Sequence, residues 1–174
     1  MAEESLITEE MRKAVGSLVN IAVTEIESGA IKRFCRATKD ANPLWQDEEY
    51  ARKTSYGGTI VPSGYLITMQ MEGESPGFYM PYQLSLKGAI DAGGEWEFFR
   101  PVRPGDVIVV DRKFIDIYQK KGSLGNMLFN EFETTYRNQR GEIVAKGRWT
   151  SIRVEAPEVE DYEGVKIERG EIKR

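Results

Sequence analysis

The second half of the chain is divided into segments that alternate apolar and polar residues, with short turns between them. Residues 107–119, 126–139 and 142–155 read VIVVDRKFIDIYQ, NMLFNEFETTYRNQ and EIVAKGRWTSIRVE. A period of two places successive side chains on opposite faces of a β-strand. The links KKGSLG and Arg140-Gly141 are so short that the strands they join must run antiparallel. The pattern predicts an antiparallel meander, and this restricts the fold more than any other feature of the sequence.

Two further strands are expected upstream of the meander. GAIDAGGEWEFFRPV at 88–102 reads as a strand interrupted by glycines, and VRPGD at 102–106 forms a turn with Pro-Gly at its centre. VNIAVTEI at 19–26 contains β-branched residues in rough alternation and reads as another strand. Within the strand at 126–139, Met127, Phe129, Glu131 and Glu133 fall on one parity, and Leu128, Phe132 and Tyr136 fall on the other, with exceptions.

The first half of the chain reads mainly as helix and loop. Residues 8–18 predict a short helix with acidic residues in its first turn, where they interact favourably with the helix dipole. Residues 29–40 predict a second helix, which Ser28 can cap and which Asn42-Pro43 stops. Its apolar residues stand at helical spacing, so one face is expected to be buried: Ile31, Phe34, Cys35 and Thr38.

Two more helices flank a pair of glycines. Asp47 can cap a short helix, EEYARKT, that ends before Gly57-Gly58. A further helix is expected to begin near Pro62 or Ser63 and to run to about Gly73. Helices beside an antiparallel sheet predict one α+β domain over residues 1–155, followed by a charged tail at 156–174. One face of the sheet would wrap the helix at 63–73, and the other would meet solvent or a partner chain.

Composition excludes several classes of function. The formal net charge of −4 provides no basic field for nucleic acid. No apolar run approaches the length that spans a membrane, and the acidic start lacks the apolar segment of a signal peptide. The single cysteine, Cys35, cannot form an internal disulfide and favours a reducing compartment, so a cytoplasmic protein is expected. Without histidine, the commonest general base and an ordinary zinc site are both missing.

Two blocks of sequence resemble a known family. FCRATKDANPLWQDEEYARKTSYGGTIVP at 34–62 resembles the signature of MaoC-like (R)-specific enoyl-CoA hydratases and dehydratases, which have a hot-dog fold. GGEWEFFRPVRPGDVIVV at 93–110 and FETTYRNQRGEIVAKGRWTSIR at 132–153 resemble the N-terminal type of MaoC domain, which is related to dehydratase regions of fatty-acid synthase. Together the similarity covers about residues 8–154. It implies a single hot-dog domain whose antiparallel sheet wraps around a central helix.

The family chemistry adds water to a 2-enoyl thioester or removes it again. In the family an Asp and a His share the water, and a backbone N–H at the start of the central helix stabilises the enolate. The resemblance places Asp40 at the Asp position and Trp45 at the His position. It assigns the remaining positions to substrate binding: Asn42 in the Asn-Pro turn, Tyr56 with Gly57 and Gly58 in the glycine step, and Ser63 or Gly64 at the oxyanion donor.

Trp45 is a departure from the family pattern. An indole donates one hydrogen bond but cannot cycle a proton near neutral pH, and no other residue of the chain is a histidine. The resemblance therefore implies a subunit that shapes an acyl-CoA or enoyl-CoA pocket while a catalytic MaoC-type partner supplies the Asp-His pair. Both a homodimer and a heterodimer stay open. No metal is implied, and no cofactor other than the coenzyme A thioester, which is the substrate.

Two other functions stay open. A hot-dog acyl-CoA thioesterase would use Asp40 as its base, and a non-enzymatic acyl-CoA-binding scaffold would dock on a thiolase or on an OB-fold acyl-CoA-binding protein. A neighbouring reading frame with an intact Asp-x-Asn-Pro-x-His pattern would favour the dehydratase subunit. Its absence would favour one of the other two functions.

Several of these residues also have a plain structural interpretation. Asp40 can cap the Asn-Pro loop, Trp45 can be a packing residue, and Ser63 can cap a helix. The glycine pair can be a simple turn, and Cys35 can be buried packing.

The same holds for the charged residues of the strand at 88–102 and the turn after it. Alternation places Glu95 and Glu97 on one face, toward solvent or an interface. Arg100 and Arg103 can meet coenzyme A phosphates or remain solvated.

Overall fold

Five antiparallel strands form one sheet in the computed structural model, which describes residues 5–69, 73, 80–83, 86 and 88–155. The strands are β1 (Leu18–Glu25), β2 (Gly88–Phe98), β3 (Val107–Gly122), β4 (Gly125–Arg137) and β5 (Ile143–Val154). Their order in the sheet is β1-β3-β4-β5-β2, so β1 and β2 are the edge strands. The charged tail at 156–174 lies outside the described residues.

The predicted meander is confirmed. β3 and β4 form a long hairpin that closes on the pair Gly122↔Gly125, and β4 pairs with β5 across a turn in which the N–H of Gly141 donates to the carbonyl of Asn138. β2 returns to pair with the outer side of β5, and β1 pairs with β3. β2 carries a register shift between Asp91 and Gly94, where the sequence shows its glycine interruption.

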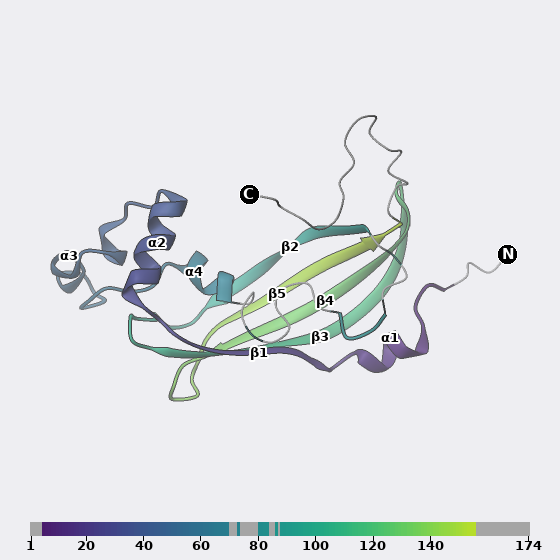
Figure 1. Cartoon of the computed structure of the whole chain (residues 1–174), viewed down its shortest axis with the longest axis horizontal. Helices are drawn as coiled ribbons and strands as arrows, with labels where there is room; N and C mark the ends of the chain where they lie inside the picture. Colours follow the sequence, from purple (N-terminus) through teal and green to yellow (C-terminus); the bar gives the residue numbers. More distant parts are fainter. Residues whose placement is uncertain (1–4, 70–72, 74–79, 84–85, 87, 156–174) are drawn as a thin grey trace, which may run out of the picture.

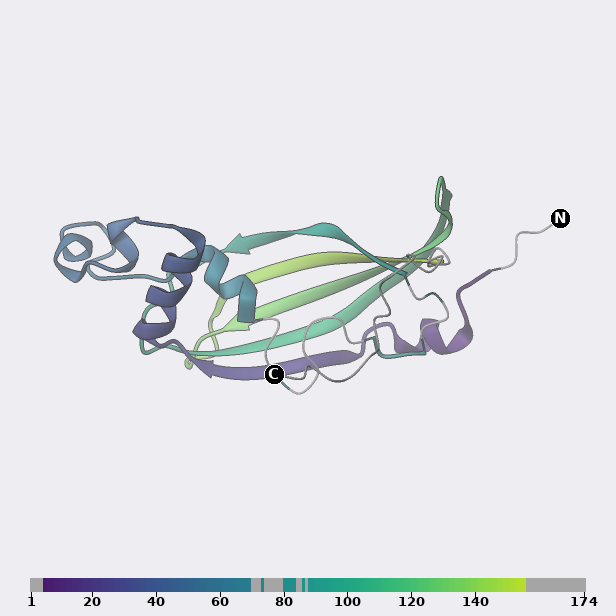
Figure 2. The same cartoon turned by 45° about the horizontal axis from the view of Figure 1, so that its top comes forward.

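The helices gather toward the two ends of the elongated sheet (Figure 1). They are α1 (Glu9–Ala14), α2 (Ser28–Thr38), α3 (Glu48–Arg52) and α4 (Ser63–Thr68), with a 3-10 turn, η1, at Pro43–Trp45. α1 lies at one end, and α2 and α3 lie at the other. The sheet curls so that β1 and β2 pass on either side of α4 (Figure 2), which is the expected wrapping of a central helix.

Three expected helix boundaries were wrong. Ser28 is the first residue of α2, Glu27 occupies the N-cap position, and no side chain caps this helix. α2 ends at Thr38 because Lys39 adopts a left-handed backbone with φ 57°, before Asn42-Pro43 can act. α1 stops at Ala14, since Val15 is extended. The helix expected over 63–73 begins at Ser63, as predicted, and its described part ends at Thr68; residues 70–72 lie outside the description.

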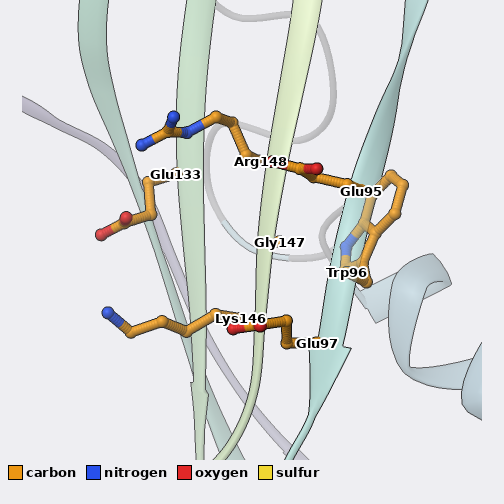
Figure 3. Close-up of a pocket in the computed structure, with 7 residues that line it drawn as sticks. All are labelled: Glu95, Trp96, Glu97, Glu133, Lys146, Gly147 and Arg148. Carbon is orange, nitrogen blue, oxygen red and sulfur yellow. The ribbon is translucent and has the colours of Figure 1, made fainter.

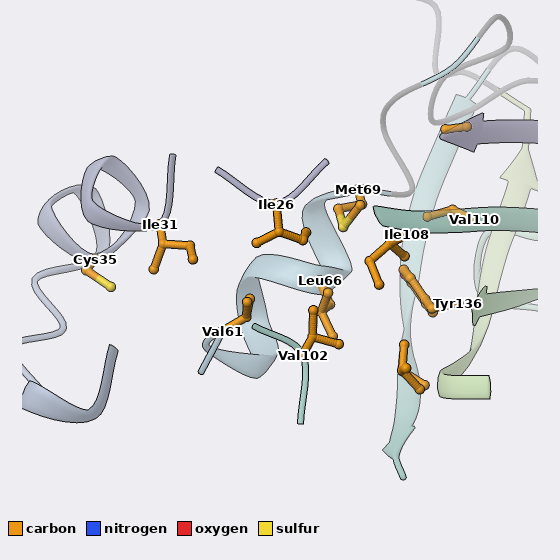
Figure 4. Close-up of a cluster of buried hydrophobic side chains, with 13 residues drawn as sticks. Ile26, Ile31, Cys35, Val61, Leu66, Met69, Val102, Ile108, Val110 and Tyr136 are labelled. Atoms are coloured by element: carbon orange, nitrogen blue, oxygen red, sulfur yellow. The ribbon is translucent and has the colours of Figure 1, made fainter. Parts of the chain in front are cut away.

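One hydrophobic core lies between α4 and the sheet (Figure 4). Leu66 and Met69 are 3% and 0% exposed and belong to the same cluster as Val110 and Tyr136 of the strands. Ile31 and Cys35 of α2 also belong to it, which confirms the centre of the predicted apolar face, whereas Thr38 is exposed. Burial of large apolar side chains contributes about 2 kcal/mol each, so this cluster fixes where α4 sits on the sheet.

A second cluster fills the other half of the inner face, and it contains a buried cation. Phe114, Phe132 and Trp149 are its central aromatic residues. The guanidinium of Arg112, 2% exposed, lies 4.1 Å from the ring centroid of Phe132 and 5.0 Å from that of Trp149. Burial lowers the pKa of Arg112 to about 10. The stacking partly replaces the hydration that the cation loses.

Gly147 gives the tightest packing in the sheet. It pairs with Trp96 across β2 and β5, and the indole of Trp96 lies directly over its backbone. A Cβ built at position 147 would fall inside contact distance of the indole Nε1. Only glycine therefore lets Trp96 lie flat on the sheet and join the core under α4.

We predict that Gly147→Ala destabilises the protein by about 1–3 kcal/mol, because the indole or the strand must move to accept the methyl group. Urea unfolding followed by tryptophan fluorescence measures the change. Gly29→Ala is the matched control, since a Cβ there meets only the end of the flexible Arg33 side chain at 3.3 Å, and alanine favours helix by up to about 1 kcal/mol. Equal stability of the two variants would contradict the packing argument.

Candidate functional site

Asp40 and Trp45 are joined by a hydrogen bond at the end of α2. The indole Nε1–H of Trp45 donates to Oδ2 of Asp40 at 2.9 Å, and the backbone N–H of Asn42 donates to Oδ1 at 3.1 Å. Both carboxylate oxygens are therefore engaged within the segment 40–45. The ring of Trp45 packs against the core cluster under α4, so the pair is anchored on its apolar side.

The segment that carries this pair is shaped by its own short side chains. Oδ1 of Asn42 accepts from the N–H of Leu44 at 3.0 Å, which starts the 3-10 turn η1 with Pro43 at its first position. Asp47 caps α3 as predicted, because its Oδ1 accepts from the N–H of Tyr50 at 3.0 Å. Asn42 thus holds the turn, and its substrate-binding role stays a prediction.

Arg103 fastens the glycine loop to the sheet. Its guanidinium donates to the carbonyl of Tyr56 and, at 3.4 Å, to the carbonyl of Thr59. From the other side, the carboxylate of Glu48 accepts from the N–H of Thr59 at 3.1 Å, and this hydrogen bond is the largest cause of the lowered pKa of Glu48. The loop 56–59 is thereby held between α3 and the turn before β3.

Glycine is favoured at positions 57 and 58 for two different structural reasons. Gly57 has φ 67°, a conformation that glycine adopts without strain. A Cβ at Gly58 would lie 3.1 Å from Nη1 of Arg103, so a side chain there would push against the guanidinium. From sequence, Arg103 is expected to be either a phosphate ligand or a solvated residue; in the structure its guanidinium holds the glycine loop. The turn predicted for VRPGD contains Arg103 but gives no indication that its guanidinium contacts the carbonyls of Tyr56 and Thr59.

α4 begins directly after this loop. Pro62 occupies its N-cap position and no side chain caps the helix, so the interpretation of Ser63 as a cap was wrong: Ser63 is already the first helical residue. Gly64 lies beneath the ring of Phe34, where a Cβ would stand 3.3 Å from Cζ. The N–H of Val61 donates to the carbonyl of Val102 at 2.8 Å and ties the entry of α4 to the turn before β3.

A hollow of about 300 Å³ opens between this loop and the end of β2. It brings together three of the predicted site residues, Trp45, Tyr56 and Ser63. Its other walls are largely apolar: Ile60, Val61, Leu66, Phe98, Phe99, Arg100, Pro101 and Val102. Asp40, Asn42, Gly57, Gly58 and Gly64 do not line it.

Phe98 and Phe99 are a part of this hollow that sequence reasoning missed. They are 41% and 52% exposed, at the end of an edge strand. Large aromatic residues left this open are unusual for a side of the molecule that faces only water. Arg100 beside them lies 3.8 Å from the carboxylate of Glu142.

A second hollow, of about 410 Å³, lies beside Asp40. Its walls are Lys32, Cys35, Arg36, Lys39, Asp40, Ala41 and Gln46. Burial, followed by the nearby charge of Asp40, raises the pKa of Cys35, which keeps this thiol protonated and agrees with a packing role. Trp45 lines the first hollow and Asp40 the second, so their hydrogen bond joins a wall of one hollow to a wall of the other.

A third hollow lies over β2, β4 and β5 (Figure 3). Glu95 is paired with Arg148 and Glu97 with Lys146 across the strands, and Glu133 of β4 completes the charged surface. Glu95 and Glu97 are both exposed, as their spacing predicted. Opposite charges alternate across the strands, which is typical of a solvated sheet face.

Within the described part of the chain, no cluster of three histidine, cysteine or carboxylate side chains is arranged to hold a metal ion. None of the helices found there is long and apolar enough to cross a membrane.

Comparison with known proteins identifies the architecture. The model of the family described as "FAS1-like, dehydratase domain region" matches residues 13–147. The "Probable enoyl-CoA hydratase alpha subunit" of Thermomonospora curvata is 33% identical in an alignment of 147 residues that covers 76% of this chain and 46% of that protein. The chain thus spans less than half the length of this relative.

Solved structures show the same fold. The MaoC-like dehydratase from Rhodospirillum rubrum superposes with a TM-score of 0.64 at 29% identity, over 83% of this chain and 94% of that chain. A chain of the ChsH1-ChsH2 complex from Mycobacterium tuberculosis superposes with a TM-score of 0.69 at 18% identity, over 81% of this chain and 86% of that chain.

We predict that Arg103→Met destabilises the protein by about 1–3 kcal/mol, because two backbone carbonyls of the glycine loop lose a charged donor. Chemical unfolding gives the change, and amide hydrogen exchange in residues 56–59 should become faster. Arg100→Met is the matched control, since its ion pair is exposed and worth less than about 1 kcal/mol. The loop-holding role is wrong if both variants unfold at the same urea concentration.

Proposed function

The chain belongs to the FAS1-like dehydratase region family, the MaoC-like hot-dog dehydratases, and from this premise we propose that it is a non-catalytic subunit of an enoyl-CoA hydratase or 3-hydroxyacyl-CoA dehydratase. In this proposal it binds the acyl part of a coenzyme A thioester and works with a catalytic MaoC-type partner. The observation that carries the proposal is the hydrogen bond from the indole of Trp45 to Asp40.

Hydration of an enoyl thioester needs a group that takes a proton from water and a group that returns one to carbon. Asp40 is the carboxylate that the family pattern requires, but its neighbour in the His position is an indole. The Nε1–H of an indole is a donor only, so the bond of 2.9 Å from Trp45 engages Asp40 without supplying the acid-base chemistry of an imidazole. The chain has no histidine that another segment could bring in.

The parts of the site that bind rather than react are in place for this role. The apolar hollow beside Trp45, Tyr56 and Ser63 has room for a short acyl segment. The backbone N–H of Ser63 or Gly64 takes the oxyanion-donor role that the resemblance implies. Arg103 and Glu48 hold the glycine loop at the mouth of this hollow, so the binding surface is already formed without ligand.

A heteromeric partner is favoured over a second copy. Two copies of this chain would still contain no imidazole, so a homodimer could not supply the missing base. One relative is named an alpha subunit, and one structural neighbour belongs to a complex of two different chains. The edge strand β2, with Phe98 and Phe99 exposed at its end, offers unpaired backbone groups and apolar surface for such a chain.

We predict that the purified chain alone does not hydrate crotonyl-CoA or longer enoyl-CoA substrates, and that it co-purifies with a short MaoC protein carrying an intact Asp-x-Asn-Pro-x-His pattern. The pair should hydrate enoyl-CoA faster than the partner alone. A coupled absorbance assay at the enoyl thioester band measures the rates. Robust hydration by this chain without a partner would sink the proposal.

Asp40→Asn separates the dehydratase subunit from a thioesterase. We predict that it lowers the hydration rate of the pair by less than about tenfold, because loss of a working general base or acid costs on the order of 10²–10⁴-fold. An asparagine oxygen can still accept from Trp45. A thioesterase that uses Asp40 would instead hydrolyse acyl-CoA without a partner and lose this activity in the variant. Tight ligand binding without turnover in every pairing would indicate a scaffold.

A further inference from the structure

Three cations of α2 and its C-cap form a positive wall on the second hollow. Lys32, Arg36 and Lys39 all line it, and all three are exposed. Their spacing of four and three residues places them along one face, over about 10 Å of helix axis. α2 itself contains no acidic residue. The hollow therefore carries local positive charge in a chain whose net charge is −4.

These three cations form no ion pairs within the described part of the chain, in contrast to other basic residues near the site. Arg52 and Lys53 of the α3 region pair with Glu48 and Glu49 at 3.0 and 2.8 Å. Arg100 pairs with Glu142, and Arg103 holds the glycine loop. Across the described residues, no ion pair is formed by Lys32, Arg36 or Lys39.

One carboxylate, that of Asp40, shares the hollow with these cations. Its two oxygens accept from Trp45 and from the backbone of Asn42, which are neutral donors. The hollow of about 410 Å³ therefore presents three cations against one carboxylate, so positive charge is in excess. Such a surface favours a ligand with several negative charges close together.

The position of the hollow identifies which ligand fits. One wall of the apolar hollow is Trp45, one wall of the cationic hollow is Asp40, and these two side chains are bonded to each other. A ligand that crosses this pair would have an apolar end on one side and an anionic end on the other. A coenzyme A thioester has this arrangement, with its diphosphate and 3′-phosphate separated from the acyl chain by the pantetheine arm.

We propose that Lys32, Arg36 and Lys39 bind the phosphate groups of the coenzyme A thioester. This assignment rests on the proposed function, since it takes the acyl part to lie in the hollow beside Trp45. The cations act by direct contact and by raising the local concentration of the anionic ligand, and both contributions weaken as salt screens the charges.

The test is equilibrium binding of coenzyme A to the full chain, measured by calorimetry at several salt concentrations. In the variant Lys32→Gln/Arg36→Gln/Lys39→Asn, asparagine tolerates the left-handed backbone of position 39. We expect about tenfold weaker binding and a smaller dependence on salt. Arg12→Gln/Lys13→Gln/Lys113→Gln is the matched control: it removes the same charge from exposed positions elsewhere and should bind like the parent chain. Coenzyme A that lacks the 3′-phosphate should bind the parent chain more weakly than coenzyme A does. The α2 substitutions should also reduce its affinity by a smaller factor than they reduce the affinity for coenzyme A.

Two results would overturn the assignment of the phosphate groups to Lys32, Arg36 and Lys39. One is undiminished binding of coenzyme A by the α2 variant, and the other is the lack of saturable binding by the parent chain. An α2 variant that loses only the binding of a holo acyl carrier protein would instead make this wall a docking surface for an acidic protein. The binding measurements test the phosphate assignment, and the hydration assay tests the proposed function. Either of the two proposals can therefore be contradicted while the other is supported.

Discussion

A curled antiparallel sheet needs a cover for its apolar inner face, and the placement of α4 as that cover determines the site. Leu66 and Met69 are almost fully buried against residues of β3 and β4. Since each such side chain contributes about 2 kcal/mol, α4 cannot slide without exposing the core. Its entry is further tied to the sheet by the bond from Val61 to Val102. The apolar hollow is the space left between this fixed entry and the end of β2, so its shape follows from the packing of the core.

The Asp40-Trp45 pair shows that the geometry of a site and its chemistry can be separated. The turn that presents the pair is complete: Lys39 ends α2, Asn42 starts η1, and both oxygens of Asp40 are satisfied. An indole is larger than an imidazole and mostly apolar, and here its ring packs on the core while its single N–H faces the carboxylate. If Trp45 stands at the family's His position, as proposed, the indole keeps an apolar pocket wall there, and what it lacks is the capacity for proton transfer.

The sheet and most helices could be predicted because their signals are local. Alternation predicted the meander and placed Leu128, Phe132 and Tyr136 on one parity, which the structure shows to be buried, and the short-range cap of Asp47 was predicted correctly. The errors at Ser28 and Ser63 have one cause: serine is a good capping residue, yet Glu27 and Pro62 already occupy the cap positions. Arg103 could not be assigned because its partners Tyr56 and Thr59 lie 47 and 44 residues away in sequence. The exposure of Phe98 and Phe99 depends on strand order, which no local pattern determines.

The position of β2 bears on where the proposed partner would dock. β2 is an edge strand, its backbone is unpaired on one side, and the hollow beside Trp45 opens where it ends. A chain that adds to this edge would cover Phe98 and Phe99 and would bring its own residues to the mouth of the hollow. Under the proposed function, an imidazole that acts on a bound thioester would come from such a chain, because this one contains no histidine. β1 is the other edge strand, but the hollow beside Trp45 is lined by residues at the end of β2 and not by residues of β1.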